Sequence, residues 1–432
     1  MVNQNLPPAA DEIDGNALLG ANDFSGAARA FKEALADDSS CRRSWHGLAL
    51  TYAANGQTSL FIKTIDEACL KFSGDLTFAL NVYLGLILWP YGYEAVEALA
   101  RNLPDNHPAQ VLATYYAGCA ALVRNDIDEA FDQFMVFRNA LTAQKDMFPV
   151  TTDENMNIMF RQALLIERPE IVRQIEFAGE DSFPVYAPDL RFDGQPHHPQ
   201  HPETPIIISC CNGVYFQQFA TTFVNSIVEH CPHAIVHIHV AEPDADTLMI
   251  IDRIRACHPT LRLNHSIETG TPYSGSVYFA ANRFLLAERF LDFYQSAITI
   301  FDIDGELNQD PAPLLGSITP SDIACFSSGR FEPASVYPAA FVYLAHSPPA
   351  IRFTKLLRRF ILMKLDLPVG ISWMLDQAAL FSVIHFLTAA APELCFTDIK
   401  KTKGLTLTDY FTPYENPEVK LELMRRGSAK AT

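Results

Sequence analysis

The chain has 432 residues, a length typical of two or three domains, and its composition, 49% hydrophobic and 19% charged, is that of a globular protein. Its formal net charge of −18 excludes a general nucleic-acid binder and a protein that binds anionic membranes, because both need a basic surface. The acidity is uneven, since residues 1–190 carry 26 acids and 13 bases whereas residues 191–432 carry 24 and 19. The two halves are therefore expected to differ in function.

The start of the chain and its cysteines indicate a compartment. The chain begins without the basic residues or the apolar core of a signal peptide. Its longest apolar runs, around 78–90 and 378–392, are too short to span a bilayer. The nine cysteines include no CxxC pair, which favours reduced thiols over a disulfide framework. We expect a cytoplasmic protein with no integral membrane segment and no nucleic-acid partner.

A helix-turn-helix pattern recurs four times in the first half. Aligning Asp23, Gly56, Gly92 and Asp126 gives spacings of 33, 36 and 34 residues, close to the period of about 34 residues of the tetratricopeptide repeat. Asp, Asn and Gly suit a sharp turn between two helices, and the alanines and aromatics around them suit close helix packing. Residues 10–145 resemble an array of about four tetratricopeptide repeats, with a plain helical bundle as the alternative.

Such an array forms a concave surface that binds a protein or a peptide. Two interpretations stay open: a protein partner on the array, or packing of the array on the second domain or on another copy. The repeat domain is expected over 10–180 and a linker over 181–203, where prolines exclude a helix or a central strand. The linker histidines His197, His198 and His201 lie in a Pro-rich connector with no cysteine among them, which favours a solvated segment over a metal site.

The second half, 204–415, alternates strand-like apolar runs with helical ones, and a tail follows over 416–432. This order predicts a doubly wound, mostly parallel α/β sheet, whose ligands bind beyond the carboxyl ends of the strands. The last strand of the series leads directly into Asp302 and Asp304. The expected strands are 204–211, 234–240, 261–265 and 297–301, and the expected helices are 216–230, 246–257 and 277–293.

Asp302 and Asp304 suit a hard divalent cation that also contacts a diphosphate. Mg²⁺ and Mn²⁺ prefer oxygen ligands and commonly take one or two carboxylates together with phosphate oxygens. A single DxD triplet is common in surface loops, but the position of this one directly after an apolar strand of a βα series favours a metal site.

Five features in order resemble a GT-A-type glycosyltransferase over residues 204–410, closest to the family 8-like and related bacterial nucleotide-diphospho-sugar transferases. They are Cys-Asn-Gly at 211–213, an aromatic and arginine helix at 278–284, the DxD segment at 300–304, a strand at 339–344 and Asp-Gln at 376–377. The resemblance implies the fold class: an all-α, TPR-like helical repeat followed by an α/β domain with a doubly wound, mostly parallel, GT-A-like sheet.

The resemblance also implies roles for the site residues. Asp302 would contact the nucleotide ribose and the metal, and Asp304 would be the main metal ligand. Arg283 would contact the diphosphate or the donor sugar, and its alternative is a structural ion pair with Glu288 or a neighbouring acid. Asp376 would be the general base of an inverting reaction, or would orient the sugar in a retaining one, and its alternative is a helix N-cap or an acid in the first turn of a helix.

Further residues complete the expected site. Asn212 and Tyr278 would contact the substrate, and Gln377 would lie beside the donor sugar and the acceptor. Family 8 enzymes end with an HxxGxxK segment that supplies a third metal ligand and a phosphate-binding Lys, but the corresponding stretch here contains no His. Asp398 would replace the missing ligand, and Lys403 would close over the diphosphate unless it lies in a solvated loop.

The resemblance therefore implies a metal-dependent glycosyltransferase of the hexosyltransferase kind, with Mn²⁺ or Mg²⁺ as its cofactor. It would move a sugar from a nucleotide-diphospho-sugar donor to a sugar or protein acceptor presented by the repeats. Two alternatives stay open, an interaction scaffold whose transferase domain is degenerate and a nucleotidyltransferase. The second needs a Gly-rich, basic phosphate loop early in the domain, and residues 209–213 do not provide one.

Overall fold

The chain forms two compact units, Met1–Asp153 and Glu154–Thr432. None of the described helices is both long and apolar enough to cross a lipid bilayer. The structure, a computed structural model, describes residues 10–72, 110–143, 164–186, 188–193, 199, 204–270, 273, 275–365 and 374–413.

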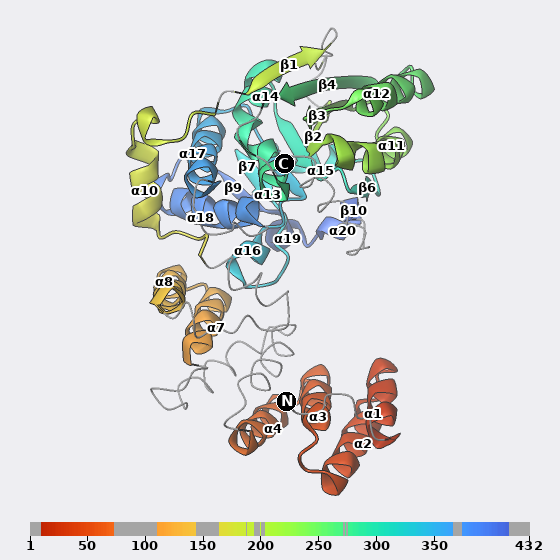
Figure 1. Cartoon of the computed structure of the whole chain (residues 1–432), viewed down its shortest axis with the longest axis vertical. Coiled ribbons are helices and arrows are strands. Elements are labelled where there is room, and N and C mark those ends of the chain that lie inside the picture. Colours follow the sequence, from red (N-terminus) through yellow and green to blue (C-terminus); the bar gives the residue numbers. More distant parts are fainter. Residues whose placement is uncertain are drawn as a thin grey trace. The chain divides into compact units, whose positions relative to one another are not determined.

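The first unit consists of helical hairpins. The first four helices pack in sequence, each of the first three on the helix that follows it, and a further pair forms a hairpin of the same kind (Figure 1). The four helices are α1 (Ala10–Gly20), α2 (Phe24–Asp37), α3 (Arg42–Ala54) and α4 (Thr58–Lys71), and the further pair is α7 (Gln110–Val123) and α8 (Ile127–Ala143).

The turns of three hairpins coincide with the turns predicted from the repeat spacing. Asn22, Gly56 and Asn125 take left-handed backbone conformations, with φ of 60°, 67° and 59°, which Gly and Asn adopt at the lowest steric cost. Asp23 and Asp126 then cap the following helices, because their carboxylates accept from backbone N–H groups three residues on, at 2.9 and 3.2 Å. The third predicted turn, at Gly92, lies outside the described residues.

Glycines and buried phenylalanines bring the helices of the first unit into close contact. The ring of Phe31 on α2 is fully buried and lies against Gly15 of α1 and Gly47 of α3. A Cβ at either glycine would overlap that ring. Gly118 of α7 receives the buried ring of Phe134 of α8 in the same way. The first and last repeats therefore share one packing device, in which a glycine admits an aromatic ring from the partner helix.

An eight-stranded sheet forms the centre of the second unit, in the order β1-β4-β3-β2-β5-β8-β7-β9. Six strands run in one direction and two, β1 and β8, run against their neighbours, so the predicted mostly parallel sheet is confirmed. The strands are β1 (Asp189–Asp193), β2 (Ile206–Asn212), β3 (Ile235–Ala241), β4 (Arg262–Thr269), β5 (Ile298–Phe301), β7 (Ile323–Cys325), β8 (Phe341–Leu344) and β9 (Phe396–Asp398).

Helices cover both faces of this sheet (Figure 1). One face presents Val236, Ile238 and Val240 of β3 to a core shared with α11 (Gly213–His230) and α12 (Ala245–Cys257). The other face lies against α13 (Ser276–Leu285) and α14 (Ala287–Tyr294), and α17 (Pro348–Leu365) and α18 (Leu375–Ala390) pack on α13. The predicted single helix over 277–293 is thus two helices that meet at Leu286.

The smaller elements are β6 (Gly305–Leu307), α15 (Ala312–Ile318), α16 (Pro333–Val336), α19 (Ile399–Lys403), α20 (Leu407–Tyr410) and β10 (Phe411–Pro413).

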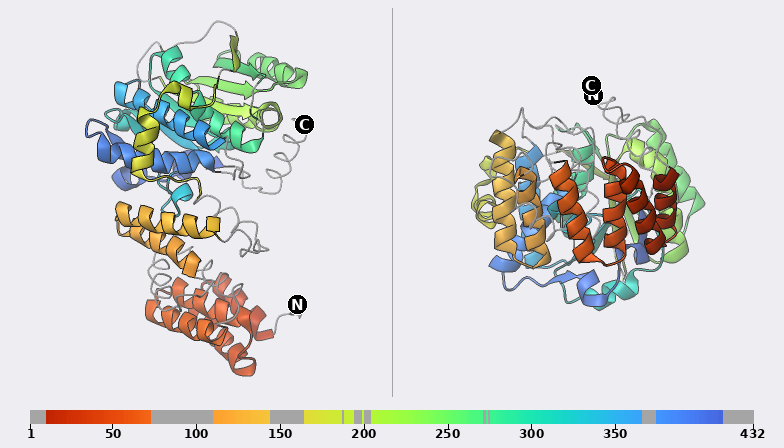
Figure 2. Two further views of the ribbon diagram at one scale, coloured as in Figure 1. Left: turned by 60° about the vertical axis from the view of Figure 1, so that its left-hand side comes forward. Right: turned by 90° about the horizontal axis from the view of Figure 1, so that it is seen from below.

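The boundary between the two parts differs from the expected one. Residues up to 180 were expected in the repeat domain, but α10 (Pro169–Phe177) packs on α17 and α18 of the second unit (Figure 2). A buried ion pair between Glu167 and Lys364 and a 2.5 Å pair between Glu176 and Arg352 hold it there. The expected linker contains β1, which pairs with β4 at the edge of the sheet. Proline excludes a central strand but permits an edge strand, so the Pro-rich composition of this stretch did not predict that β1 pairs with β4.

Candidate active site

Asp302 and Asp304 lie where the chain leaves β5, at the carboxyl end of a central strand. Both acids are partly exposed, whereas Ile303 between them is buried in the core. Gly305 starts β6 directly afterwards, and a Cβ at this glycine would overlap the ring of Phe411 in the neighbouring strand β10. The buried isoleucine therefore anchors the middle of the acidic segment and the tight contact at Gly305 fixes its end, with the two carboxylates on the exposed side.

Arg283 connects Asp302 to Asp376. Its Nη1 pairs with Oδ1 of Asp302, and its Nη2 donates to Oδ2 of Asp376 at 2.6 Å. The side chains of Arg283 and Asp376 are 7% and 4% exposed, while that of Asp302 is 27% exposed. One guanidinium thus joins the end of α13, the end of β5 and the first turn of α18.

Arg283 forms buried ion pairs, as its structural alternative expected, but not with Glu288. Glu288 pairs with Lys355 at 3.4 Å, so the expected alternative partner of Arg283 is engaged elsewhere. Arg283 forms its ion pairs with two of the predicted site residues instead. Its Nε is buried with no hydrogen-bond partner among the described residues. A buried donor without a partner is costly, and it often marks a place where a ligand or water binds.

Asp376 is oriented from two sides. Its Oδ2 accepts from Arg283, and its Oδ1 accepts from the backbone N–H of Gln377 at 2.9 Å. It lies in the first turn of α18, as the helix-cap alternative expected, but Met374 occupies the cap position itself. Gln377 is half-buried beside it. The buried carboxylate is therefore fixed in orientation beside the acidic segment.

Asn212 and Tyr215 form the first β-to-α turn near Asp304. The side-chain oxygen of Asn212 caps α11 by accepting from the N–H of Tyr215 at 2.9 Å. Burial and the negative charge of Asp304 raise the pKa of the Tyr215 hydroxyl above its usual range. Burial, Cys210 and Asp304 likewise raise the pKa of the Cys211 thiol. The Tyr215 hydroxyl is buried without a hydrogen-bond partner among the described residues, close enough to Asp304 to be affected by its charge.

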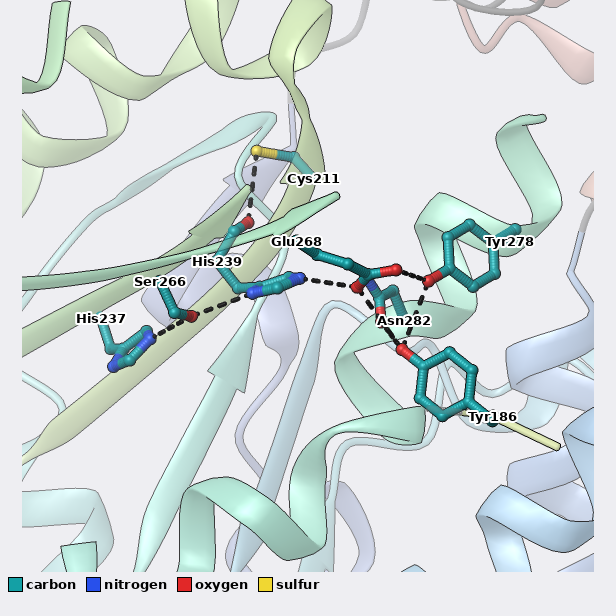
Figure 3. Close-up of polar contacts among 8 residues, drawn as sticks. All are labelled: Tyr186, Cys211, His237, His239, Ser266, Glu268, Tyr278 and Asn282. Atoms are coloured by element: carbon teal, nitrogen blue, oxygen red, sulfur yellow. Dashed lines mark hydrogen bonds and ion pairs between the residues drawn. The ribbon is translucent and has the colours of Figure 1, made fainter. Parts of the chain in front are cut away.

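Tyr278 belongs to a buried polar network behind the cluster of Asp302, Arg283 and Asp376. Its hydroxyl donates to Glu268, whose other carboxylate oxygen contacts Nε2 of His239 at 3.1 Å and accepts from Nδ2 of Asn282 at 3.0 Å (Figure 3). Glu268 is completely buried. Burial by itself raises the pKa of its carboxyl, but the contacts with His239, Tyr278 and Asn282 outweigh burial, so that the pKa lies below its usual value. The network continues through Ser266 to His237 on one side and to Tyr186 on the other.

Glu268 was not predicted from the sequence, although a signal exists. Polar residues occupy alternate positions in two paired strands, at 237 and 239 in β3 and at 264, 266 and 268 in β4. Alternating polar residues usually mark the exposed face of a strand, but here that face is covered by α13 and α14. Strand β4 also extends beyond the predicted strand, to Thr269, and so includes Glu268.

The lysines of α19 belong to a different part of the sheet from Asp302 and Asp304. Lys403 is exposed at the end of α19, and Lys400 donates to the carbonyl of Ser328 at 3.0 Å. Asp398 caps α19 and accepts from Ser327 at 2.9 Å. Its register places it three strand spacings from Ile300, roughly 14 Å away. The prediction that Asp398 supplies a third ligand to a metal at Asp302 is therefore wrong.

The two acids fit Mg²⁺ or Mn²⁺ in the chemistry of their donor atoms, since both cations prefer carboxylate oxygens. One oxygen of Asp302 pairs with Arg283, so a metal would share this carboxylate with the guanidinium. No third His, Cys, Asp or Glu in the described part of the chain joins Asp302 and Asp304 in a close group. The remaining ligands would thus come from water or from phosphate oxygens.

Comparison with known proteins supports the repeat assignment. The family model of the tetratricopeptide repeat matches residues 15–75, which covers the first two hairpins and confirms the expected resemblance there. A search of curated proteins found no match.

Among solved structures, the chain is similar to three glycosyltransferases. WbbM, a bifunctional glycosyltransferase, is 13% identical over 48% of this chain and 40% of its own, with a TM-score of 0.32. GlyE of Streptococcus pneumoniae TIGR4 is 12% identical over 46% of each chain, with a TM-score of 0.32. Mouse xyloside xylosyltransferase 1 is 10% identical over 45% of this chain and 84% of its own, with a TM-score of 0.31. The chain spans less than half the length of WbbM and GlyE.

Proposed function

We propose that the second unit is a glycosyltransferase that moves a sugar from a nucleotide-diphospho-sugar to an acceptor. The observation that carries this proposal is the buried Arg283, held between Asp302 and Asp376 at the carboxyl edge of a mostly parallel sheet. Ligands of such sheets bind at this edge. A cation and several carboxylates at one site suit a reaction in which a diphosphate leaves from a sugar.

The leaving diphosphate gains negative charge as the glycosidic bond breaks, and a positioned cation stabilises that charge. Arg283 is suited to this role because a guanidinium is always charged and binds two oxygens at once. Its unpartnered Nε and the Tyr215 hydroxyl are two buried donors that phosphate or ribose oxygens would satisfy. Asp302 and Asp304 would hold Mg²⁺ or Mn²⁺, which supplies further positive charge to the diphosphate when bound.

Asp376 and Gln377 would face the sugar. The carboxylate of Asp376 is held by Arg283 and by the backbone of Gln377, and a fixed orientation is what a group that positions a substrate needs. In an inverting reaction Asp376 would accept the proton of the acceptor hydroxyl, and in a retaining reaction it would orient the donor sugar. Asn212, Tyr278 and Lys403 have weaker claims, because the first caps a helix, the second is buried in the Glu268 network and the third lies exposed at the end of α19.

The repeat array would bind a protein, and this protein would be either the acceptor itself or a partner that delivers it. The match of residues 15–75 to the tetratricopeptide repeat favours this role, since stacked helical hairpins present an extended binding surface. The alternative is a scaffold whose transferase domain no longer acts. Donor binding distinguishes the two, because a degenerate domain needs no nucleotide-sugar.

The deciding experiment is a thermal-shift screen of nucleotide-sugars with Mn²⁺, followed by hydrolysis of the donor that binds. A ligand that binds only the folded state raises its melting temperature. Asp304→Ala should abolish the metal-dependent part of both signals, whereas Asp246→Ala, which removes an exposed acid on α12, should leave them unchanged. If the wild-type protein neither binds nor hydrolyses any donor with Mn²⁺ present, the glycosyltransferase proposal fails and the scaffold is favoured.

A further inference from the structure

A second group of metal-ligating side chains lies away from the acids of the candidate active site. Among the described residues, one set of three His, Cys, Asp or Glu side chains brings its ligand atoms within 4.8 Å of one another, and it consists of Cys231, His233 and Asp310. Cys231 and His233 lie in the turn that leads from α11 into the amino end of β3, whereas Asp302 and Asp304 follow the carboxyl end of β5. The two groups therefore lie toward opposite ends of the parallel strands.

The ligand atoms have nearly the spacing of a tetrahedral zinc site. The Sγ of Cys231 lies 3.9 Å from Nδ1 and 3.8 Å from Nε2 of His233. The Nε2 of His233 lies 3.8 Å from Oδ2 of Asp310. Ligands bound to one tetrahedral Zn²⁺ lie about 3.3–3.6 Å apart, given its usual bond lengths. Because Sγ is almost equidistant from the two ring nitrogens, the imidazole of His233 must turn to direct one nitrogen at the ion, and its 49% exposed side chain has room to do so.

The backbone orients these side chains before any ion binds. The N–H of Ala234 donates to the carbonyl of Cys231 at 3.0 Å and closes a turn in which Pro232 fixes one backbone angle. Oδ1 of Asp310 accepts from the N–H of Ala312 at 2.9 Å, which orients the carboxylate with its Oδ2 toward His233. Hydrogen bonds of this kind hold metal ligands in their binding orientation.

We propose that Cys231, His233 and Asp310 bind a Zn²⁺ ion, with a solvent water as the fourth ligand. A sulfur, a nitrogen and an oxygen suit zinc, a cation of intermediate softness, whereas Mg²⁺ and Ca²⁺ prefer oxygen alone. The sulfur is buried, but the side chains of His233 and Asp310 are 49% and 36% exposed, so the site is accessible from solvent. On binding, the Cys231 thiol releases its proton to water and its sulfur forms the Zn–S bond, with no change of oxidation state.

The thiol lies in a buried environment beside an acid. Burial and the carboxylate of Asp310 raise the pKa of Cys231, and the backbone N–H of Ala234 and the nearby Arg262 oppose them only in part. Binding of the ion must displace the thiol proton. The bound ion would link the turn after α11 to Asp310, which follows β6. It would thereby stabilise the end of the segment that runs from Asp304 through β6.

The test uses Co²⁺ as a spectroscopic probe on the full chain after treatment with a chelator. A thiolate bound to Co²⁺ gives a charge-transfer band in the near ultraviolet, and we expect one bound Co²⁺ per chain with this band. Cys231→Ser should abolish the band, whereas Cys257→Ser, which removes an exposed thiol elsewhere, should leave it unchanged. Asp310→Asn keeps an oxygen that can accept from Ala312 but loses the charge, and it should weaken Co²⁺ binding by at least about tenfold.

Two further variants keep the result interpretable. His233→Ala changes a half-exposed side chain, so it should retain the fold and still lose the band and the rise in melting temperature that Zn²⁺ produces. Asp304→Ala should retain both, because the zinc site does not depend on the acids of the proposed transferase. The proposal is overturned if the wild-type protein shows no thiolate band, or if the band survives in Cys231→Ser or His233→Ala.

Discussion

Arg283 and Asp376 are 93 positions apart in the chain, yet a 2.6 Å hydrogen bond joins their nearly buried side chains. The same guanidinium pairs with Asp302, so a single cation compensates two acids from different elements. Burying charges is favourable only when they are paired, because each loses its water shell. The pair therefore connects the stability of the second unit to the chemistry of its candidate site.

We predict that Arg283→Met lowers the free energy of unfolding by about 3–5 kcal/mol, because it leaves Asp376 buried without a cation. Asp376→Asn should cost less, since an amide oxygen still accepts from Arg283 and Asp302 still pairs with it. Urea denaturation followed by circular dichroism measures both. Arg283→Lys should retain more stability but lose donor hydrolysis by about 10²–10³-fold, because an ammonium cannot bridge two groups as a guanidinium does.

The matched control is Arg289→Met, which removes an exposed arginine from the neighbouring helix α14. Surface substitutions of this kind change stability by less than about 0.5 kcal/mol. Similar losses from Arg283→Met and Arg289→Met would contradict the role assigned to the buried cluster.

We predict that Glu268→Gln destabilises the second unit by about 1–3 kcal/mol at neutral pH. The substitution replaces one carboxylate oxygen by an NH₂ group, which then faces a donor, either Tyr278 at Oε1 or Asn282 at Oε2. A buried polar group without its partner carries a cost of that size. Glu229→Gln, at an exposed position on α11, should have almost no effect. Equal unfolding midpoints in urea for the two variants would show that the network contributes nothing to stability.

The same variant has a predicted signature in acid. The folded-state pKa of Glu268 lies below its unfolded value, so its carboxylate contributes stability that is fully present above the unfolded pKa and is lost as the pH falls through the folded pKa. The wild-type protein should therefore lose more stability than Glu268→Gln between about pH 5 and pH 3. Urea titrations at a series of pH values measure the difference between the two slopes.

The order of elements and the position of the acids could be predicted from sequence because both are local. An apolar run of strand length followed by Asp302 and Asp304 places the acids at the carboxyl end of β5 without reference to the rest of the chain. The turns of the repeats were predictable for the same reason, because the preference of Asn and Gly for left-handed backbone conformations is local to each turn.

Contacts between distant elements could not be predicted in this way. The pairing of Arg283 with Asp376 depends on how α13 packs beside α18, and no spacing in the sequence encodes that. Glu268 was missed because an alternating polar strand has the same pattern whether its polar face meets water or another helix. β1 was missed because its pairing with β4 joins distant parts of the sequence, in a stretch whose prolines suggested a linker.

We predict that the second unit loses stability as the pH falls below about 6.5, partly through His237. Burial, together with the neighbouring His239 and His265, lowers the pKa of His237 well below its usual value. The unfolded chain takes up a proton there as the pH falls and the folded chain does not, so stability decreases by up to about 1.4 kcal/mol per pH unit for this group. His237→Gln should show a smaller decrease between pH 7 and pH 5.5, whereas the exposed His346→Gln should match the wild type.

We predict that Gly47→Ala disturbs the repeat array. The new methyl group would overlap the buried ring of Phe31, and overpacking of this kind costs about 1–3 kcal/mol. The matched control is Gly20→Ala, because no atom lies within 4 Å of the position that its Cβ would take. Thermal unfolding followed by circular dichroism compares the two. A Gly47→Ala variant as stable as Gly20→Ala would mean that the ring of Phe31 moves aside at little cost.

We predict that the second unit needs residues 164–180 for its stability. A chain of residues 154–432 retains Glu167 and Glu176, whereas a chain of residues 181–432 removes Glu167 from its buried pair with Lys364 and uncovers the faces of α17 and α18 that α10 occupies. Breaking a buried ion pair by removing one partner costs about 3–5 kcal/mol. We therefore expect the longer chain to unfold cooperatively in urea and to hydrolyse donor like the full protein, while the shorter chain is less stable by at least that amount. If both chains unfold at the same urea concentration, residues 164–180 are no part of the second unit; if the longer chain loses donor hydrolysis, the repeats contribute to the catalytic domain itself rather than to its acceptor.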